Sequence, residues 1–179
     1  MRALALLVLA GLSAAPPALG ALSYERFRHP QGDYVVAYPS DWKRSVGIET
    51  LKLRPDGAAG KLVRVSIEKH PFGSKEAATP EAFIAEMLTS AEGFKRLDAR
   101  DTIKVSGKDA ERLVLTETTA LKGTLGTLLP GPMTEVVVVV PFGKGFYALR
   151  LTGTGGGLAA ARPEFDRLVA GLKLGSGAR

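Results

Sequence analysis

The sequence contains no cysteine, so disulfide bonds, thiolate metal sites, a cysteine nucleophile and lipidation on an N-terminal cysteine are all excluded. Histidine is almost as scarce, with only His29 and His70 in 179 residues. Neither the G-x-S-x-G elbow of serine hydrolases nor the H-E-x-x-H pair of zinc proteases occurs. Because these signatures are missing, we expect a protein that is not an enzyme and has no catalytic, metal or cofactor site.

A long hydrophobic run is also missing, although the first twenty residues are rich in apolar ones. Arg2, the apolar run 3–12 and Ala18-Leu19-Gly20 have the layout of a secretory signal peptide. A membrane-spanning helix needs about 20 apolar residues, more than this run offers, and Pro16-Pro17 interrupts the segment. We therefore expect residues 1–20 to be removed and the chain to be exported to the periplasm or the extracellular medium. A retained membrane anchor is the alternative.

No long block of like charge is present, although the chain is basic, with a net charge of +6. Such a charge attracts anionic partners, including anionic membrane surfaces and nucleic acid. However, the basic residues alternate with acidic ones, as in Arg96–Asp101, which is typical of a solvated surface. An anionic membrane surface remains a possible partner, whereas export makes nucleic acid an unexpected one.

The most informative stretch that is present runs from Thr134 to Thr152. Val136–Val140 is a run of five β-branched residues, which favour strands. Phe146–Leu151 predicts a second strand, and Gly143 with Gly145 suits the tight turn of a hairpin. Because the valine run is too apolar for a strand with one wet face, we expect it at the centre of a sheet that is covered on both sides.

The rest of the chain predicts further strands and a first helix. Alternating or β-branched segments predict strands at 33–38, 49–53, 62–70, 102–105 and 110–118. Thr79-Pro80-Glu81 is a helix start, because threonine caps, proline suits the first helical position and glutamate complements the dipole. An apolar stripe at helical spacing follows, consisting of Phe83, Ile84, Met87, Leu88 and Ala91.

A second amphipathic helix is predicted at 159–172, with Phe165, Leu168 and Val169 in its stripe, and Pro163 suggests a start near Arg162. The glycine-rich run 153–157 before it predicts a flexible turn. An anion-binding loop is the alternative, but the phosphate-binding and dinucleotide-binding glycine patterns are not matched.

These elements predict an α+β sandwich with a mainly antiparallel sheet of about seven strands and two amphipathic helices. We expect 21–32 to be a flexible, poorly anchored lead-in, 33–174 to form one domain, and 175–179 to be a frayed tail.

Apolar residues in two places are candidates for an interaction surface. Trp42 belongs to an aromatic group that either forms a recognition patch or packs at the edge of the sheet. The segment 120–133 is apolar but broken by glycine and proline, so it either caps the core or presents a patch. The candidate surface comprises Trp42, Leu125, Leu128, Leu129 and Met133.

Glu68 and His70 lie two residues apart in a predicted strand, so their side chains project from one face and offer two metal ligands. A third ligand is needed, and His29 is the possibility that the sequence offers. The simpler interpretation is an exposed charged pair at the end of a strand.

The order of features resembles the PsbP-like superfamily, which includes DcrB-type bacterial envelope proteins and the yeast Ran-binding import factor. Six elements carry the likeness: Tyr34–Trp42 (Y-V-V-A-Y-P-S-D-W), a strand pair, the helix begun by Thr79-Pro80-Glu81, Val105–Ala110 (V-S-G-K-D-A), the aromatic strand Gly145–Leu149, and the final helix with Phe165, Leu168 and Val169. The resemblance implies an α/β/α sandwich around an antiparallel sheet and a non-enzymatic accessory or binding role. No catalytic residues are carried over.

We therefore expect an exported, non-enzymatic protein that contacts another envelope protein. The first alternative is a carrier of a lipid or other apolar small molecule, which requires a cavity lined by Leu, Met and Phe. The second is a hydrolase or metal-dependent enzyme that uses Glu68 and His70.

Overall fold

The valine run forms β8 (Met133–Phe142), an interior strand of the larger of two sheets. This computed structural model describes residues 22–57, 62–71, 73, 79–91, 94–117 and 132–175. β8 pairs antiparallel with β7 (Lys108–Glu117) on one side and with β9 (Gly145–Thr154) on the other. All five valines are buried and alternate between the two faces of the sheet. The expected central, doubly covered strand is confirmed.

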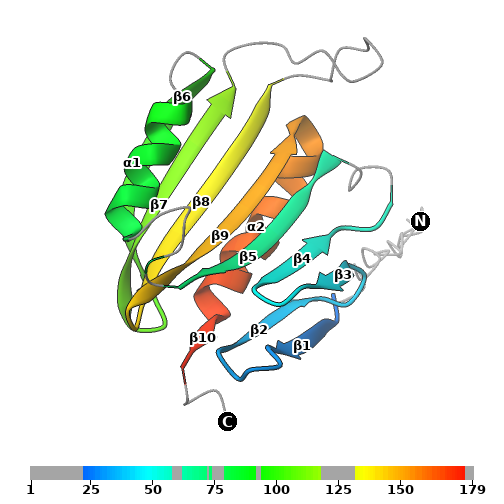
Figure 1. The fold of residues 1–179 in the computed structure, drawn as a ribbon. Helices are drawn as coiled ribbons and strands as arrows, with labels where there is room; N and C mark the ends of the chain where they lie inside the picture. Colours follow the sequence, from blue (N-terminus) through cyan, green and yellow to red (C-terminus); the bar gives the residue numbers. More distant parts are fainter. Residues whose placement is uncertain are drawn as a thin grey trace, which may run out of the picture.

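The larger sheet has seven strands, and each neighbouring pair is antiparallel (Figure 1). Their order is β3 (Lys43–Val46), β4 (Thr50–Arg54), β5 (Arg64–His70), β9, β8, β7 and β6 (Lys95–Val105). Strand β5 therefore pairs with β9, which lies far from it in the sequence. This pairing joins the first half of the chain to the final hairpin.

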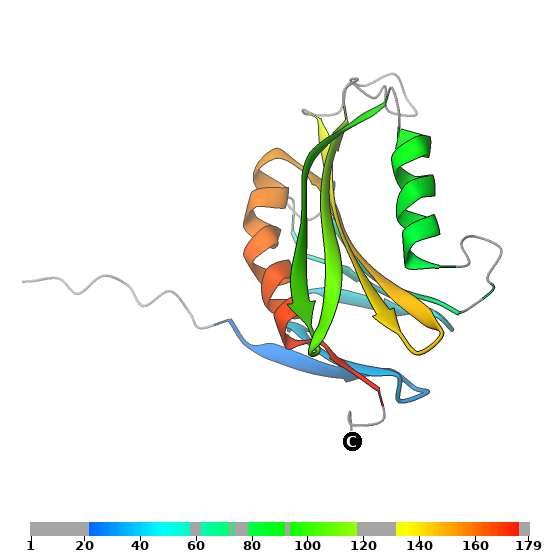
Figure 2. The same cartoon turned by 90° about the vertical axis from the view of Figure 1, so that its left-hand side faces the viewer.

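Two helices lie on opposite faces of this sheet (Figure 2). The helix α1 (Pro80–Ala91) begins as predicted, and Thr79 Oγ1 accepts a hydrogen bond from the Ala82 amide at 3.2 Å. The helix α2 (Gly155–Gly171) covers the other face with Phe165 and Leu168 buried. The arrangement is the predicted α+β sandwich.

Helix α2 begins earlier than the sequence predicts, so the predicted starts at Ala159 and near Arg162 are wrong. The predicted flexible turn at 153–157 is also wrong, because Gly153 lies within β9 and Gly155 is the first residue of α2. A Cβ atom on Gly153 would lie 3.1 Å from Val63 Cγ2, and Gly155 has φ +45°. Close packing and backbone conformation therefore account for these two glycines.

A second sheet has three strands, β1 (Tyr24–Arg28), β2 (Tyr34–Pro39) and β10 (Lys173–Leu174), in the order β1-β2-β10. The prediction of a flexible lead-in is wrong for β1, because all five of its residues pair with β2. Phe27 is buried and lies 6.0 Å from the Tyr34 ring, which explains the anchoring. The predicted strand at 33–38 exists as β2, but it belongs to this second sheet.

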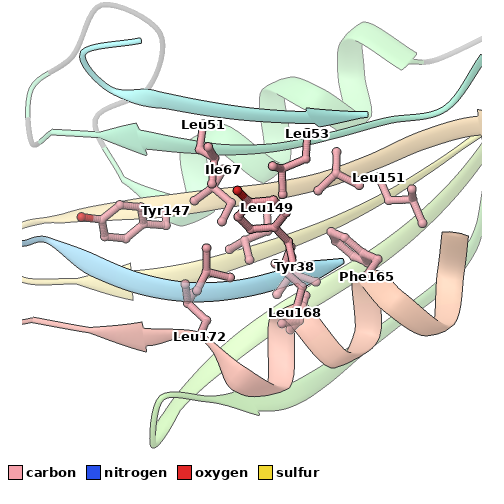
Figure 3. Close-up of a cluster of buried hydrophobic side chains, with 14 of the residues drawn as sticks. Tyr38, Leu51, Leu53, Ile67, Tyr147, Leu149, Leu151, Phe165, Leu168 and Leu172 are labelled. Atoms are coloured by element: carbon pink, nitrogen blue, oxygen red, sulfur yellow. The ribbon is translucent and has the colours of Figure 1, made fainter. Parts of the chain in front are cut away.

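The core has two parts, one on each face of the larger sheet. The larger part lies under α2 and combines side chains from the large sheet, the small sheet and the helix (Figure 3). The smaller part lies under α1 and consists of Phe83, Ile84, Leu113, Val137, Val139, Phe146 and Ala148. The difference in extent leaves part of the α1 side of the large sheet without a helix over it.

Candidate functional site

The part of the α1 side that α1 does not cover forms a groove of about 570 Å3. Beneath α1 the sheet presents apolar side chains of β7, β8 and β9. Along the same face, toward β3, β4 and β5, the side chains become polar and charged. The groove is therefore an open, charged continuation of a face whose other half belongs to the core.

Strand alternation explains why charged residues gather here. Leu51, Leu53, Val65 and Ile67 point into the core under α2. The intervening residues of β4 and β5 must then point to the α1 side. The register places Lys52 opposite Ser66, and Ser66 in turn opposite Arg150 of β9. One row of polar side chains thus crosses three strands.

A second row lies one alternation further along these strands. Arg64 pairs with Thr152 of β9, and Lys43 of β3 pairs with Arg54 of β4. Because Leu53 pairs with Val65 in an antiparallel ladder, the next residues, Arg54 and Arg64, come to lie across from each other. Three cations from three neighbouring strands therefore occupy one end of the groove.

The groove has an excess of positive charge. Its lining includes six basic and two acidic residues: Lys43, Arg44, Lys52, Arg54, Arg64 and Arg150, with Glu68 and Glu135. Both acidic residues already have cationic neighbours. Arg150 Nη1 lies 3.0 Å from Glu135 Oε1, and Arg150 Nε lies 3.7 Å from Glu68 Oε2. Lys95 Nζ donates to Glu135 Oε2 at 2.7 Å.

Glu68 is held in its charged form. His70 Nε2 lies 3.8 Å from its carboxylate, and the Ser66 hydroxyl donates a hydrogen bond to it at 2.8 Å. His70, Ser66 and Arg150 lower the pKa of Glu68 below its usual range, and burial opposes them only in part. A carboxylate with a lowered pKa is poorly suited to act as a general acid near neutral pH. Glu68 instead orients Arg150 at the floor of the groove.

Three of the remaining cations have no such partners. Among the described residues, no carboxylate lies within 4.0 Å of Lys52, Arg54 or Arg64. All three side chains are exposed. Lys43 does pair with Asp56, at 2.9 Å, but both of those groups are largely in water. The outer end of the groove is thus a cationic surface that can accept anionic groups.

Two of the predicted interaction residues, Trp42 and Met133, belong to the part of the chain that the structure describes. Trp42 is only 7% exposed and packs in the core under α2, in line with the packing alternative. Leu125, Leu128 and Leu129 lie outside the described residues. Met133 is the first residue of β8 and is half-buried. Neither Trp42 nor Met133 lines the groove.

Glu68 and His70 do project from one face, as predicted. His70 stacks on Phe146 at 4.6 Å in the core under α1, whereas His29 stacks on Tyr34 at 5.0 Å beside the small sheet. The two histidines therefore belong to opposite sides of the large sheet. Within the part of the chain that the structure describes, no three His, Asp or Glu side chains are grouped to hold a metal ion.

No protein-family model matches this chain, and no curated protein matches it in sequence. Solved structures do match. The cyanobacterial PsbP (CyanoP) of Synechocystis has 12% identity and a TM-score of 0.57, with 92% of this chain and 100% of that chain covered. The Ran-binding protein Mog1p of Saccharomyces cerevisiae has 11% identity and a TM-score of 0.58, with 86% and 96% covered.

A Pseudomonas aeruginosa protein of unknown function is a third match, with 16% identity and a TM-score of 0.52. It covers 82% of this chain, and 94% of its own length is covered. At such low identities, these likenesses establish the fold and leave the activity open. The three-layer arrangement, the antiparallel sheet and the match to CyanoP over its full length agree: this chain has the same fold as cyanobacterial PsbP.

Proposed function

We propose that this chain is an exported, non-enzymatic accessory protein of the cell envelope that binds another envelope protein. The observation that carries the proposal is the cationic groove, an open half of a sheet face in which Lys52, Arg54 and Arg64 have no carboxylate within 4.0 Å among the described residues. Exposed charges of one sign that are held on a rigid sheet favour recognition of a complementary partner. Neighbours with this fold include a Ran-binding protein, so the fold supports binding to another protein.

Export is the second part of the proposal, and it depends on the signal-like residues 1–20. No helix in the described ranges is long and apolar enough to cross a membrane. Expression of the full chain in a bacterium, followed by fractionation and mass spectrometry, tests this part. We expect the exported fraction to begin at Ala21. A chain that keeps its first residues and stays in the cytoplasm would contradict it.

The two alternatives from the sequence gain less support. An apolar carrier requires a cavity lined by Leu, Met and Phe, whereas the groove is lined mainly by Lys, Arg, Ser and Glu. A metal-dependent enzyme requires a third ligand near Glu68 and His70, and the described residues provide none. We propose neither.

Capture of partners from an envelope fraction tests the binding role. The tagged mature chain is compared with Lys52→Glu/Arg64→Glu, which reverses charge in the groove, and with Leu128→Asp/Leu129→Asp, which alters the segment 120–133. Arg26→Glu/Arg28→Glu is the matched control, because it makes the same charge change on exposed residues of β1. We expect only the groove variant to lose its partner. If the wild-type chain captures nothing beyond what an unrelated basic exported protein captures, the proposed function is wrong.

A further inference from the structure

We propose that the groove binds an extended acidic segment of the partner protein, in which Asp or Glu occupies every second position. This inference rests on the proposed function and specifies the chemistry of the partner. It uses five side chains of the groove: Lys43, Lys52, Arg54, Arg64 and Arg150.

The cations of the groove are separated from one another. Lys52 and Arg54 lie two residues apart on β4 and project to the same side. Two residues of a strand span about 6.6–6.8 Å, and neighbouring strands lie about 4.7–4.9 Å apart. Lys43, Arg54 and Arg64 therefore spread over three strands instead of converging on one point. A single phosphate needs converging donors, whereas an extended chain with several carboxylates meets all of these cations.

The spacing of alternate side chains along an extended ligand matches the spacing of the cations on β4. In an extended peptide, alternate side chains point to the same side and repeat every 6.6–6.8 Å or so, which is the spacing of Lys52 and Arg54. Acidic residues at every second position thus face the groove together. The outer strand β3 is the last of its sheet, so the groove is open on that side to a chain that lies along β4.

The height of helix α1 above the sheet limits which ligands can reach the groove. Helix α1 stands on the same side of the sheet as the groove (Figure 2). A helix with its side chains is about 10–12 Å across, so it rises well above the groove floor. A flat membrane surface that touches α1 is held away from Lys52 and Arg64, whereas a peptide strand fits beside the helix. The structure therefore favours a peptide over a bilayer of anionic lipid.

Arg150 is already paired with acidic residues of the protein itself. Glu135 and Glu68 hold its guanidinium group, and the group also lies 5.3 Å above the Phe83 ring. The acidic residues of the groove are thus engaged by Arg150 and by Lys95. Their charge is compensated inside the floor, and they offer little repulsion to an incoming carboxylate at the outer end.

Fluorescence anisotropy with synthetic peptides tests the inference. The probes are a labelled peptide with Asp at every second position and a peptide of the same composition with its Asp residues in one block. We expect the alternating peptide to bind several-fold more tightly than the block peptide, with affinity that falls as salt is raised. Lys52→Glu/Arg64→Glu is expected to weaken binding at least tenfold, and the control Arg26→Glu/Arg28→Glu less than twofold. Circular dichroism confirms that both variants are folded.

Four outcomes would overturn the inference. If the groove variant and the control variant bind the peptide with equal affinity, net charge alone attracts it. If the wild-type chain binds the two peptides with equal affinity, the proposed requirement for an acidic residue at every second position is wrong. Groove-dependent binding to phosphatidylglycerol vesicles without peptide binding would point to a membrane instead. If the wild-type chain and the groove variant capture the same envelope partner, the inference fails and the proposed function stands. If the peptide binds but no envelope partner is found, the inference about peptide chemistry stands and the proposed function fails.

Discussion

The two sides of the large sheet differ in how completely they are covered. On the α2 side, the helix and the small sheet close over a continuous core whose side chains include Tyr38, Leu51, Leu149, Phe165 and Leu168 (Figure 3). On the α1 side, one short helix covers an apolar patch, and the remaining face carries charge. The same strands supply both sides, because alternate residues point in opposite directions.

This difference separates stability from binding. Burial of apolar surface on the α2 side provides most of the driving force for folding. The charged half of the α1 side adds little to that force, because exposed ion pairs contribute about 1 kcal/mol or less. The following predictions test this separation.

The largest effect is expected from Phe165→Ala in α2. Phe165 is completely buried, so its truncation leaves a cavity and should lower the free energy of unfolding by about 3–5 kcal/mol. Phe83→Ala, on α1, should cost clearly less, because Phe83 lies at the rim of the smaller core and is 8% exposed. Urea denaturation followed by circular dichroism measures both. Equal losses would contradict the proposed contrast between the two sides.

An intermediate effect is expected from Glu135→Ala. This buried carboxylate accepts hydrogen bonds from Arg150 and Lys95, and its loss leaves both cations without it. We expect a loss of about 1.5–3 kcal/mol, typical of hydrogen bonds to charged groups. The control is Glu111→Ala, which removes the exposed ion pair with Arg100 and should cost about 1 kcal/mol or less. A smaller loss at Glu135 than at Glu111 would show that the floor of the groove is not a structural element.

A smaller effect is expected from Glu68, and it depends on pH. Its pKa is lower in the folded chain than in the unfolded one, so the ionised form stabilises the fold. This contribution is complete above the unfolded pKa of about 4.3 and is lost as the pH falls through the lower folded value. Glu68→Gln should therefore make the denaturation midpoint less dependent on pH in the acid range. An unchanged acid profile would mean that His70, Ser66 and Arg150 do not stabilise the charge.

Much of the fold could be predicted from the sequence, because strong local signals and tertiary packing agree there. Val136–Val140 and the start at Thr79-Pro80-Glu81 are examples. The strands β1, β3 and the first half of β6 were missed, because most of their residues are exposed and polar. Such edge strands form through backbone pairing with a neighbour, and this leaves little hydrophobic alternation to detect.

The groove was harder to predict. Alternation in β5 did place Arg64, Ser66 and Glu68 on one side of a strand. The sequence does not indicate that β5 pairs with β9, which brings Arg150 next to Ser66. Nor does it indicate that α1 stops short of this part of the sheet. A cationic site that is assembled from four strands becomes visible only once the strand order is known.

The smallest effect is expected from Arg64→Gln, and its sign is the sharpest test of the separation. Arg54 and Arg64 lie across from each other on β4 and β5, and like charges in that position repel. Folding therefore brings the two charges together at a cost in free energy, and no described carboxylate lies within 4.0 Å of either guanidinium group. Arg64→Gln should raise the free energy of unfolding by a few tenths of a kcal/mol at low salt. High salt screens the repulsion and should abolish the gain, whereas the control Arg28→Gln, on β1, should show no salt-dependent gain. If Arg64 lowers stability and yet supports binding of the acidic peptide, its role in the folded protein is binding. A loss of stability in Arg64→Gln would instead assign the cationic rows to the structure of the sheet.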